Sequence, residues 1–209
     1  MSHVNHPGDL ALLEAISRHT DVGYLGIVTP DGYPRVVPVN FALLGDRIYF
    51  HGATRGEKFE VFQSEPKVTF CIAVPYAQLP SHWRSPEYAC PATQYFKSVL
   101  IRGRGVLVSD TVEKATALQA LMEKHQPEGK YRKITATEPL YTKAIPGVAI
   151  FRIDPDRIDI RTKFGDQLSR ETRLKLIAKL RERREPMDLE TAAEMEARLE
   201  NQSAGEAKA

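Results

Sequence analysis

Short runs of β-branched and aromatic residues, each closed by turn residues, dominate the hydrophobic pattern after a first helical stretch. Leu10, Leu13 and Ile16 recur at helical spacing behind a capping Asp9, which predicts a packing helix over 10–19. The pattern then changes to alternation between turns rich in Gly, Asp and Pro, as in antiparallel strands. The runs predict a three-stranded meander over 22–29, 33–43 and 47–51.

Two prolines four positions apart, Pro34 and Pro38, interrupt the second of these runs. Proline has no main-chain N–H and cannot donate to a β-ladder, so it is found at sheet edges and bulges. We therefore expect this strand to lie at an edge or to carry a bulge. Its main chain is then free to face a ligand.

The later part of the chain continues the β pattern and then becomes helical. Further strands are predicted over 67–74 and 95–109, where Gly103 and Gly105 indicate a sharp bend at a barrel corner. A final hairpin is predicted from 148–153 and 157–162 around the turn at 154–156. The sequence thus favours an antiparallel β-barrel with peripheral helices.

The remaining helices and loops set the expected domain organisation. Helical periodicity is present over 56–63, 111–124, 168–184 and 189–199. The proline-rich stretch 76–93 is too long for a simple connection, so we expect a functional loop or lid, and we expect the last eight residues to be disordered. The predicted domains are a barrel over 1–165 and a charged helical extension over 166–209.

Composition narrows the class of protein. The 209 residues are 42% hydrophobic and 27% charged, with a net charge of +2 and mostly interspersed signs, which gives no reason to expect a nucleic-acid partner. No apolar run is long enough to cross a membrane, and no basic leader precedes an apolar stretch. We therefore expect a cytoplasmic protein with no membrane association.

The two cysteines, Cys71 and Cys90, lie far apart with no CxxC pair and no histidine at ligand spacing. This spacing argues against both a zinc site and a disulfide framework. We expect two free thiols and no metal site.

The segment 49–58, which joins a predicted strand to a predicted helix, is the strongest candidate for chemistry. Gly52 and Gly56 allow tight turns, and Thr54, Arg55 and Lys58 supply a hydroxyl and two cations beside the first amides of the helix. Such groups suit a phosphate, since each charge-assisted hydrogen bond contributes roughly 1.5 to 3 kcal/mol. The alternative is an ordinary strand-to-helix junction with solvated cations.

His51, at the end of the third run, is a second candidate. We expect its strand to pair with the proline-interrupted segment 35–41, whose unpaired amides and carbonyls could meet the polar edge of a flavin. The alternative is a histidine at the barrel rim with its hydrogen bonds satisfied locally.

Three groups of residues together resemble a known family. They are the run 32–41 (GYPRVVPVNF), the run 48–53 (IYFHGA) followed by Gly56-Glu57-Lys58, and Pro66-Lys67-Val68 with 95–99 (YFKSV). They resemble the FMN-binding split-barrel superfamily named after pyridoxamine 5'-phosphate oxidase, most closely its nitroimidazole-resistance reductase branch. The resemblance implies a homodimer with FMN at the subunit interface, contacted by both chains.

The resemblance also assigns roles to residues. It implies main-chain contacts to the isoalloxazine, a catalytic histidine beside the ring, a phosphate loop, and a later strand that completes the pocket. The isoalloxazine contacts fall on Val39, Asn40 and Phe41, and the catalytic histidine is His51. The phosphate loop comprises Gly52, Ala53, Thr54 and Lys58, and the later strand contributes Ser98 and Val99. Arg35 and Arg55 are further cofactor-binding candidates that could equally be surface ion-pair partners.

The function implied is an FMN-dependent oxidoreductase that passes electrons from NADH or NADPH to a small organic acceptor. The alternative is a non-catalytic module that binds FMN or haem, or senses redox state. Pyridoxamine-phosphate oxidation is disfavoured because the family's C-terminal substrate-binding sequence is not recognisable here. Trp83, Tyr88 and Tyr95 could cover the flavin or could simply pin their loop to the core.

Overall fold

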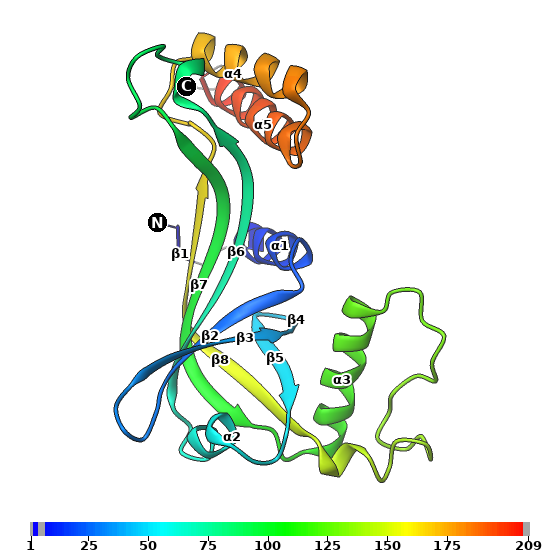
Figure 1. Ribbon diagram of the computed structural model, residues 1–209. Helices are drawn as coiled ribbons and strands as arrows, with labels where there is room; N and C mark the ends of the chain where they lie inside the picture. The colour runs from blue at the N-terminus through cyan, green and yellow to red at the C-terminus, as the bar shows by residue number, and fades with distance from the viewer. Residues whose placement is uncertain (1, 4–6, 207–209) are drawn as a thin grey trace. The chain divides into compact units, whose positions relative to one another are not determined.

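The protein is an antiparallel split β-barrel with peripheral helices, as seen in a computed structural model that describes residues 2–3 and 7–206 (Figure 1). The strands follow the order β3-β2-β6-β7-β8-β5-β4, and β1 pairs with β8. Their bounds are β1 (Ser2–His3), β2 (Val22–Val28), β3 (Pro34–Asn40), β4 (Ala42–Leu44), β5 (Arg47–Gly52), β6 (Lys67–Leu79), β7 (Thr93–Leu107) and β8 (Ala149–Lys163). The helices are α1 (Pro7–Arg18), α2 (Glu57–Phe62), α3 (Thr111–His125), α4 (Arg170–Arg183) and α5 (Asp188–Glu206), with short 3₁₀ turns η1 (Ser81–Trp83) and η2 (Ile145–Gly147).

The chain forms two compact units. The first comprises Met1–Ala73 and Ser98–Ile160, and the second comprises Val74–Lys97 and Arg161–Ala209. The three long strands β6, β7 and β8 contribute residues to both units. The domain boundary at residue 165 stays a prediction, and the compact units place residues 74–97 with the C-terminal helices.

Aromatic side chains fill the core of the first unit. Phe50 and Phe151 are fully buried and stack with ring centroids 5.0 Å apart. Phe41 and Phe70 are also fully buried and meet edge to face at 5.3 Å. Phe50 and Phe151 lie directly opposite each other on β5 and β8, where alternate residues point inward. Each buried phenylalanine contributes about 3 to 5 kcal/mol against truncation to alanine.

The predicted meander is interrupted at Phe41. β3 pairs only with β2, and the chain then leaves the ladder at Phe41 before β4 pairs with β5. The expected pairing of the third strand with 35–41 is wrong, since β5 pairs with β4 and β8 and His51 lies opposite Ile150. The predicted edge at the two prolines is confirmed, because β3 ends the strand order.

Two further predictions about strands are corrected. The hairpin predicted at 148–162 is one continuous strand, β8, which passes through residues 154–156. Arg152 and Arg47 bind the Asp154 carboxylate at 2.7 to 3.1 Å. The negative charge of Asp154 is therefore paired while its main chain stays in the strand. β6 also runs on to Leu79, so the irregular stretch between β6 and β7 is shorter than expected.

In the second unit, residues of 74–97 pack on α4 and α5. The Ala77 amide donates to the Thr191 hydroxyl at 3.0 Å, and the buried Lys97 forms an ion pair with Glu194. Carboxylates pair with three of the basic residues of α4. Its ion pairs are Lys175 with Glu171, Arg181 with Glu196, and Arg183 with Asp188.

The aromatic residues of the 76–93 stretch anchor it within the second unit. Trp83 lies 4.7 Å from the Arg183 guanidinium, and Tyr95 is buried against Phe164. These contacts support the pinning interpretation for both residues, Tyr88 remains 62% exposed, and the flavin-cover interpretation stays a prediction.

The C-terminal end is more helical than expected. α5 extends to Glu206, although the last eight residues were expected to be disordered, and residues 207–209 lie outside the described part of the chain. None of the helices across the described ranges combines the length and hydropathy needed to cross a bilayer.

Candidate functional site

The candidate site lies where the split barrel stays open, between the edge strand β3 and the end of β5. These strands run close to each other without forming a ladder. Asn40 ends β3, and His51 and Gly52 end β5. The outer edge of β3 therefore keeps main-chain donors and acceptors that no strand uses, as a heterocycle with a polar edge requires.

Lys58 is the cation of the strand-to-helix loop that the structure prepares best for an anion. Its Nζ lies half-buried over the rings of Phe50 and Phe151, 5.3 and 5.0 Å from their centroids. A Cβ added at Gly52 would stand 3.2 Å from this Nζ, so the glycine makes room for it. Burial lowers the pKa of Lys58, and within the described chain no carboxylate or hydrogen-bond acceptor pairs with the ammonium.

The other loop residues are exposed. Thr54 and Arg55 lie on the surface just before Gly56, which has a φ of 90° and begins α2 with no side-chain cap. α2 has only six residues, so its dipole offers less to a phosphate than the sequence suggested. The side chains, chiefly Lys58, must supply most of the binding.

Arg35 is already engaged at one side of this loop. Its guanidinium lies 3.1 Å from the Glu57 carboxylate, and both groups are partly exposed. Such surface pairs contribute about 0 to 1 kcal/mol, so this contact orders the first residue of α2 more than it stabilises the fold.

His51 has an unusual electrostatic environment for an exposed histidine. Partial desolvation lowers its pKa from the ordinary value of 6.5, and the positive charges of Lys58 and His125 lower it further. The neutral form of the imidazole, which can accept a proton, is therefore the main form at pH 7.

The remaining predicted residues are dispersed. Val39 pairs with Gly23 in the β2–β3 ladder, and the Asn40 side chain donates to the Asp21 carbonyl at 3.2 Å. Val99 is buried in the core, and strand alternation places Ser98 on the opposite face of β7. In the described part of the chain, no side-chain hydrogen bond or ion pair joins Ser98 or Val99 to the loop at 53–58.

Three residues at this opening were missed by the sequence analysis. Asp21 and His125 contact the β3 corner, the turn at Asn40 and Phe41 between β3 and β4. Lys124 Nζ lies 3.4 Å from the centroid of the Phe41 ring. Burial lowers the pKa of Lys124 to about 8, and its Nζ has no hydrogen-bond partner among the residues that the structure describes. Asp21 carried no signal in the sequence, and Lys124 and His125 carried only that of cations near the end of a helix, an ordinary preference.

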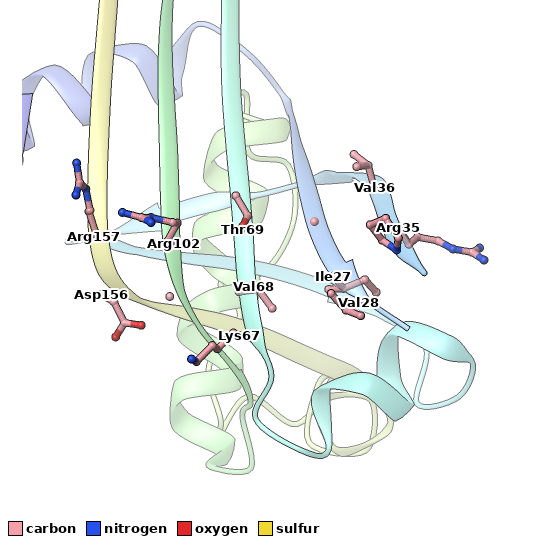
Figure 2. Close-up of a pocket in the computed structure, with 13 residues that line it drawn as sticks. Ile27, Val28, Arg35, Val36, Lys67, Val68, Thr69, Arg102, Asp156 and Arg157 are labelled. Carbon is pink, nitrogen blue, oxygen red and sulfur yellow. The ribbon is translucent and has the colours of Figure 1, made fainter. Parts of the chain in front are cut away.

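A separate groove of about 520 Å³ crosses the faces of β2, β3, β6, β7 and β8 (Figure 2). Its floor is apolar, and Lys67, Arg102 and Arg157 lie along it. Arg157 is paired with Asp159 at 2.8 Å. Arg35 is the one residue of the predicted site that lines this groove.

The sheet order and its open edge define the class, an antiparallel split barrel. The chain belongs to the pyridoxamine 5'-phosphate oxidase family, whose model matches residues 11–162. The resemblance inferred from the sequence is thus confirmed. No curated protein matches the chain.

Several solved structures share this fold. A candidate 5-nitroimidazole antibiotic resistance protein from Bacteroides thetaiotaomicron is 21% identical with a TM-score of 0.58, over 75% of this chain and 84% of that one. The flavocytochrome Anf3 from Azotobacter vinelandii is 24% identical with a TM-score of 0.59, over 73% and 67%. An FAD- and haem-binding protein from Mycobacterium smegmatis is 16% identical with a TM-score of 0.60, over 79% and 75%.

Proposed function

We propose that the protein binds FMN at the opening between β3 and β5 and uses it to pass electrons from NADH or NADPH to a small organic acceptor. The observation that carries this proposal is Lys58, a half-buried cation that no carboxylate of the described residues pairs with, beside an edge strand with free main-chain groups. A desolvated, unpaired ammonium is costly unless an anion meets it, and a phosphomonoester at this loop would do so.

The residues present fit the cofactor. Lys58, Thr54 and Arg55 would hold the phosphate with the amides after Gly52 and Ala53, and the main chain of 39–41 would meet the pyrimidine edge of the ring. Bound FMN would supply hydride and single-electron chemistry. His51, neutral at pH 7, would exchange a proton at the side of the ring.

A second copy of the chain would complete the site. Ser98 and Val99 lie on β7 and share no side-chain hydrogen bond or ion pair with the described loop, which is consistent with their serving a flavin held by the other subunit of a homodimer. The exposed apolar residues Tyr24, Val28 and Val36 on β2 and β3 offer surface for such an interface. We expect the dimer to function in the cytoplasm.

A haem-binding or redox-sensing module is the second candidate. It is favoured by the names of two solved structures, a flavocytochrome and an FAD- and haem-binding protein.

An absorption spectrum of the purified protein separates a bound flavin from a bound haem. A bound flavin gives bands near the blue end of the visible range, and haem gives an intense Soret band. Bleaching by NADH or NADPH and reoxidation by a quinone or nitro-aromatic compound would support the enzyme. A colourless protein that takes up no FMN would contradict the proposal.

His51 should give the reaction a specific pH dependence. Because the pKa of His51 lies below 6.5, the fraction of protonated imidazole falls to a small value as the pH rises toward 7. A step that needs this proton should slow over that range in the wild type and should lose the dependence in His51→Ala. Stopped-flow flavin oxidation across pH provides the measurement. Identical pH profiles for the two proteins would remove His51 from proton transfer.

A further inference from the structure

The corner between β3 and β4 is held by residues from outside the sheet. Phe41 lies between the last residue of β3 and the first residue of β4, outside both ladders. Its carbonyl accepts a hydrogen bond from His125 Nε2 at 3.3 Å, at the end of α3. Its side chain is fully buried against Phe70, which fixes the corner from the core side.

Asp21 connects to the same corner twice. Its carboxylate lies 3.5 Å from His125 Nδ1, and its main-chain carbonyl accepts a hydrogen bond from Asn40 Nδ2 at 3.2 Å. Two adjacent residues of the open edge, Asn40 and Phe41, are therefore held by one aspartate and one histidine. Neither of these holding residues belongs to β3, β4 or β5.

Both ring nitrogens of His125 face oxygen atoms of other residues. Nε2 faces a carbonyl oxygen and Nδ1 faces a carboxylate oxygen, and both oxygens can only accept. Both contacts are favourable only when each ring nitrogen bears a hydrogen, so the arrangement suits the imidazolium cation. This charge is largely shielded from solvent, since the His125 side chain is 22% exposed.

We propose that His125, oriented by Asp21, is a positioning residue that holds the Asn40–Phe41 main chain in place for the flavin and sets a positive charge beside it. The inference rests on the proposed function for its ligand. A fixed main chain loses less entropy on binding, and a nearby cation favours a flavin that has gained electrons. Lys124, over the Phe41 ring, places a second basic group at the same corner.

A simpler explanation is that His125 is an ordinary cation at a helix C-terminus, which interacts favourably with the helix dipole. That role needs neither Asp21 nor Phe41. The two explanations therefore differ in whether the effects of replacing Asp21 and His125 depend on each other.

The test compares His125→Gln, Asp21→Asn and the double variant with the wild type at one fixed, mildly acidic pH. His82→Gln is the control, because His82 is an exposed histidine of η1. Three quantities are measured in the full-length protein. They are hydrogen exchange of residues 38–44 without flavin, the Kd for FMN, and the midpoint potential of the bound flavin.

We expect His125→Gln to accelerate exchange at the corner and to raise the Kd for FMN by about 10-fold, the equivalent of one charge-assisted hydrogen bond. The midpoint potential should become more negative. Asp21→Asn should give a smaller change, and the double variant should be no worse than His125→Gln alone. His82→Gln should match the wild type.

Three results would overturn the inference. Unchanged exchange at 38–44 in His125→Gln would show that the histidine does not hold the corner. Faster exchange with unchanged FMN affinity and potential would make its role purely structural. Fully additive effects in the double variant would separate Asp21 from His125. If the wild type takes up no FMN, the proposed function fails, and the positioning role toward a flavin is rejected whatever the flavin-free exchange shows.

Discussion

Replacing Lys58 with methionine should raise the Kd for FMN by about 10- to 100-fold, because the phosphate would lose one charge-assisted contact of roughly 1.5 to 3 kcal/mol. Methionine keeps the apolar contact with Phe50 and Phe151 that the lysine stem now makes. The free energy of unfolding should stay the same or rise. The lowered pKa of Lys58 means that its charged form is disfavoured in the folded state at neutral pH, and methionine removes that cost.

Riboflavin, which lacks the phosphate, is the internal control for this prediction. Fluorescence titration should show weaker FMN binding and unchanged riboflavin binding in Lys58→Met. Lys67→Met is the matched variant, since Lys67 is an exposed cation that lines the separate groove of Figure 2. If Lys67→Met weakened FMN binding and Lys58→Met did not, the phosphate would lie in that groove and the proposed site would be wrong.

Gly103→Ala should lower the free energy of unfolding by about 2 to 3 kcal/mol, at the upper end of the usual cost of overpacking. A Cβ at this position would lie 2.1 Å from the Asp154 carbonyl oxygen and 3.0 Å from the Pro155 Cα. These are main-chain atoms of β8, so no side-chain rotation relieves the contact and the two strands must separate. Urea denaturation followed by fluorescence or circular dichroism measures the change.

Gly147→Ala is the matched control for Gly103→Ala. A Cβ at Gly147 meets no atom within 4 Å, so the same chemical change should alter stability by less than about 0.5 kcal/mol. Equal stability of the two variants would show that β7 and β8 are not closely apposed at Asp154.

The sequence predicted the strands well where alternation and turn residues agreed, and less well where tertiary contacts overrode local preference. Asp154-Pro155-Asp156 is typical of a turn, but Arg152 and Arg47 satisfy Asp154 and Gly103 admits its main chain, so β8 continues. Arg152 belongs to β8 itself, but Arg47 and Gly103 come from distant parts of the chain. Local propensity could not include them.

The sequence predicted the part of the site that is local in the chain and missed the part that forms through tertiary contacts. The loop at 53–58 carries its own signal, because its glycines, hydroxyl and cations are adjacent in the sequence. Asp21 and His125 are separated by more than a hundred positions and meet only when α3 packs beside the β3 corner. Neither residue type indicates such a meeting by itself.

Pro34 and Pro38 also bear on how the protein behaves at high concentration. A free strand edge is a template onto which an unfolded or neighbouring chain can add a strand, which is the first step of many aggregation reactions. Each proline on β3 removes one of the hydrogen-bond donors that such an intruding strand would need. The same two residues that leave this edge open to a small ligand therefore make it a poor template for fibril growth.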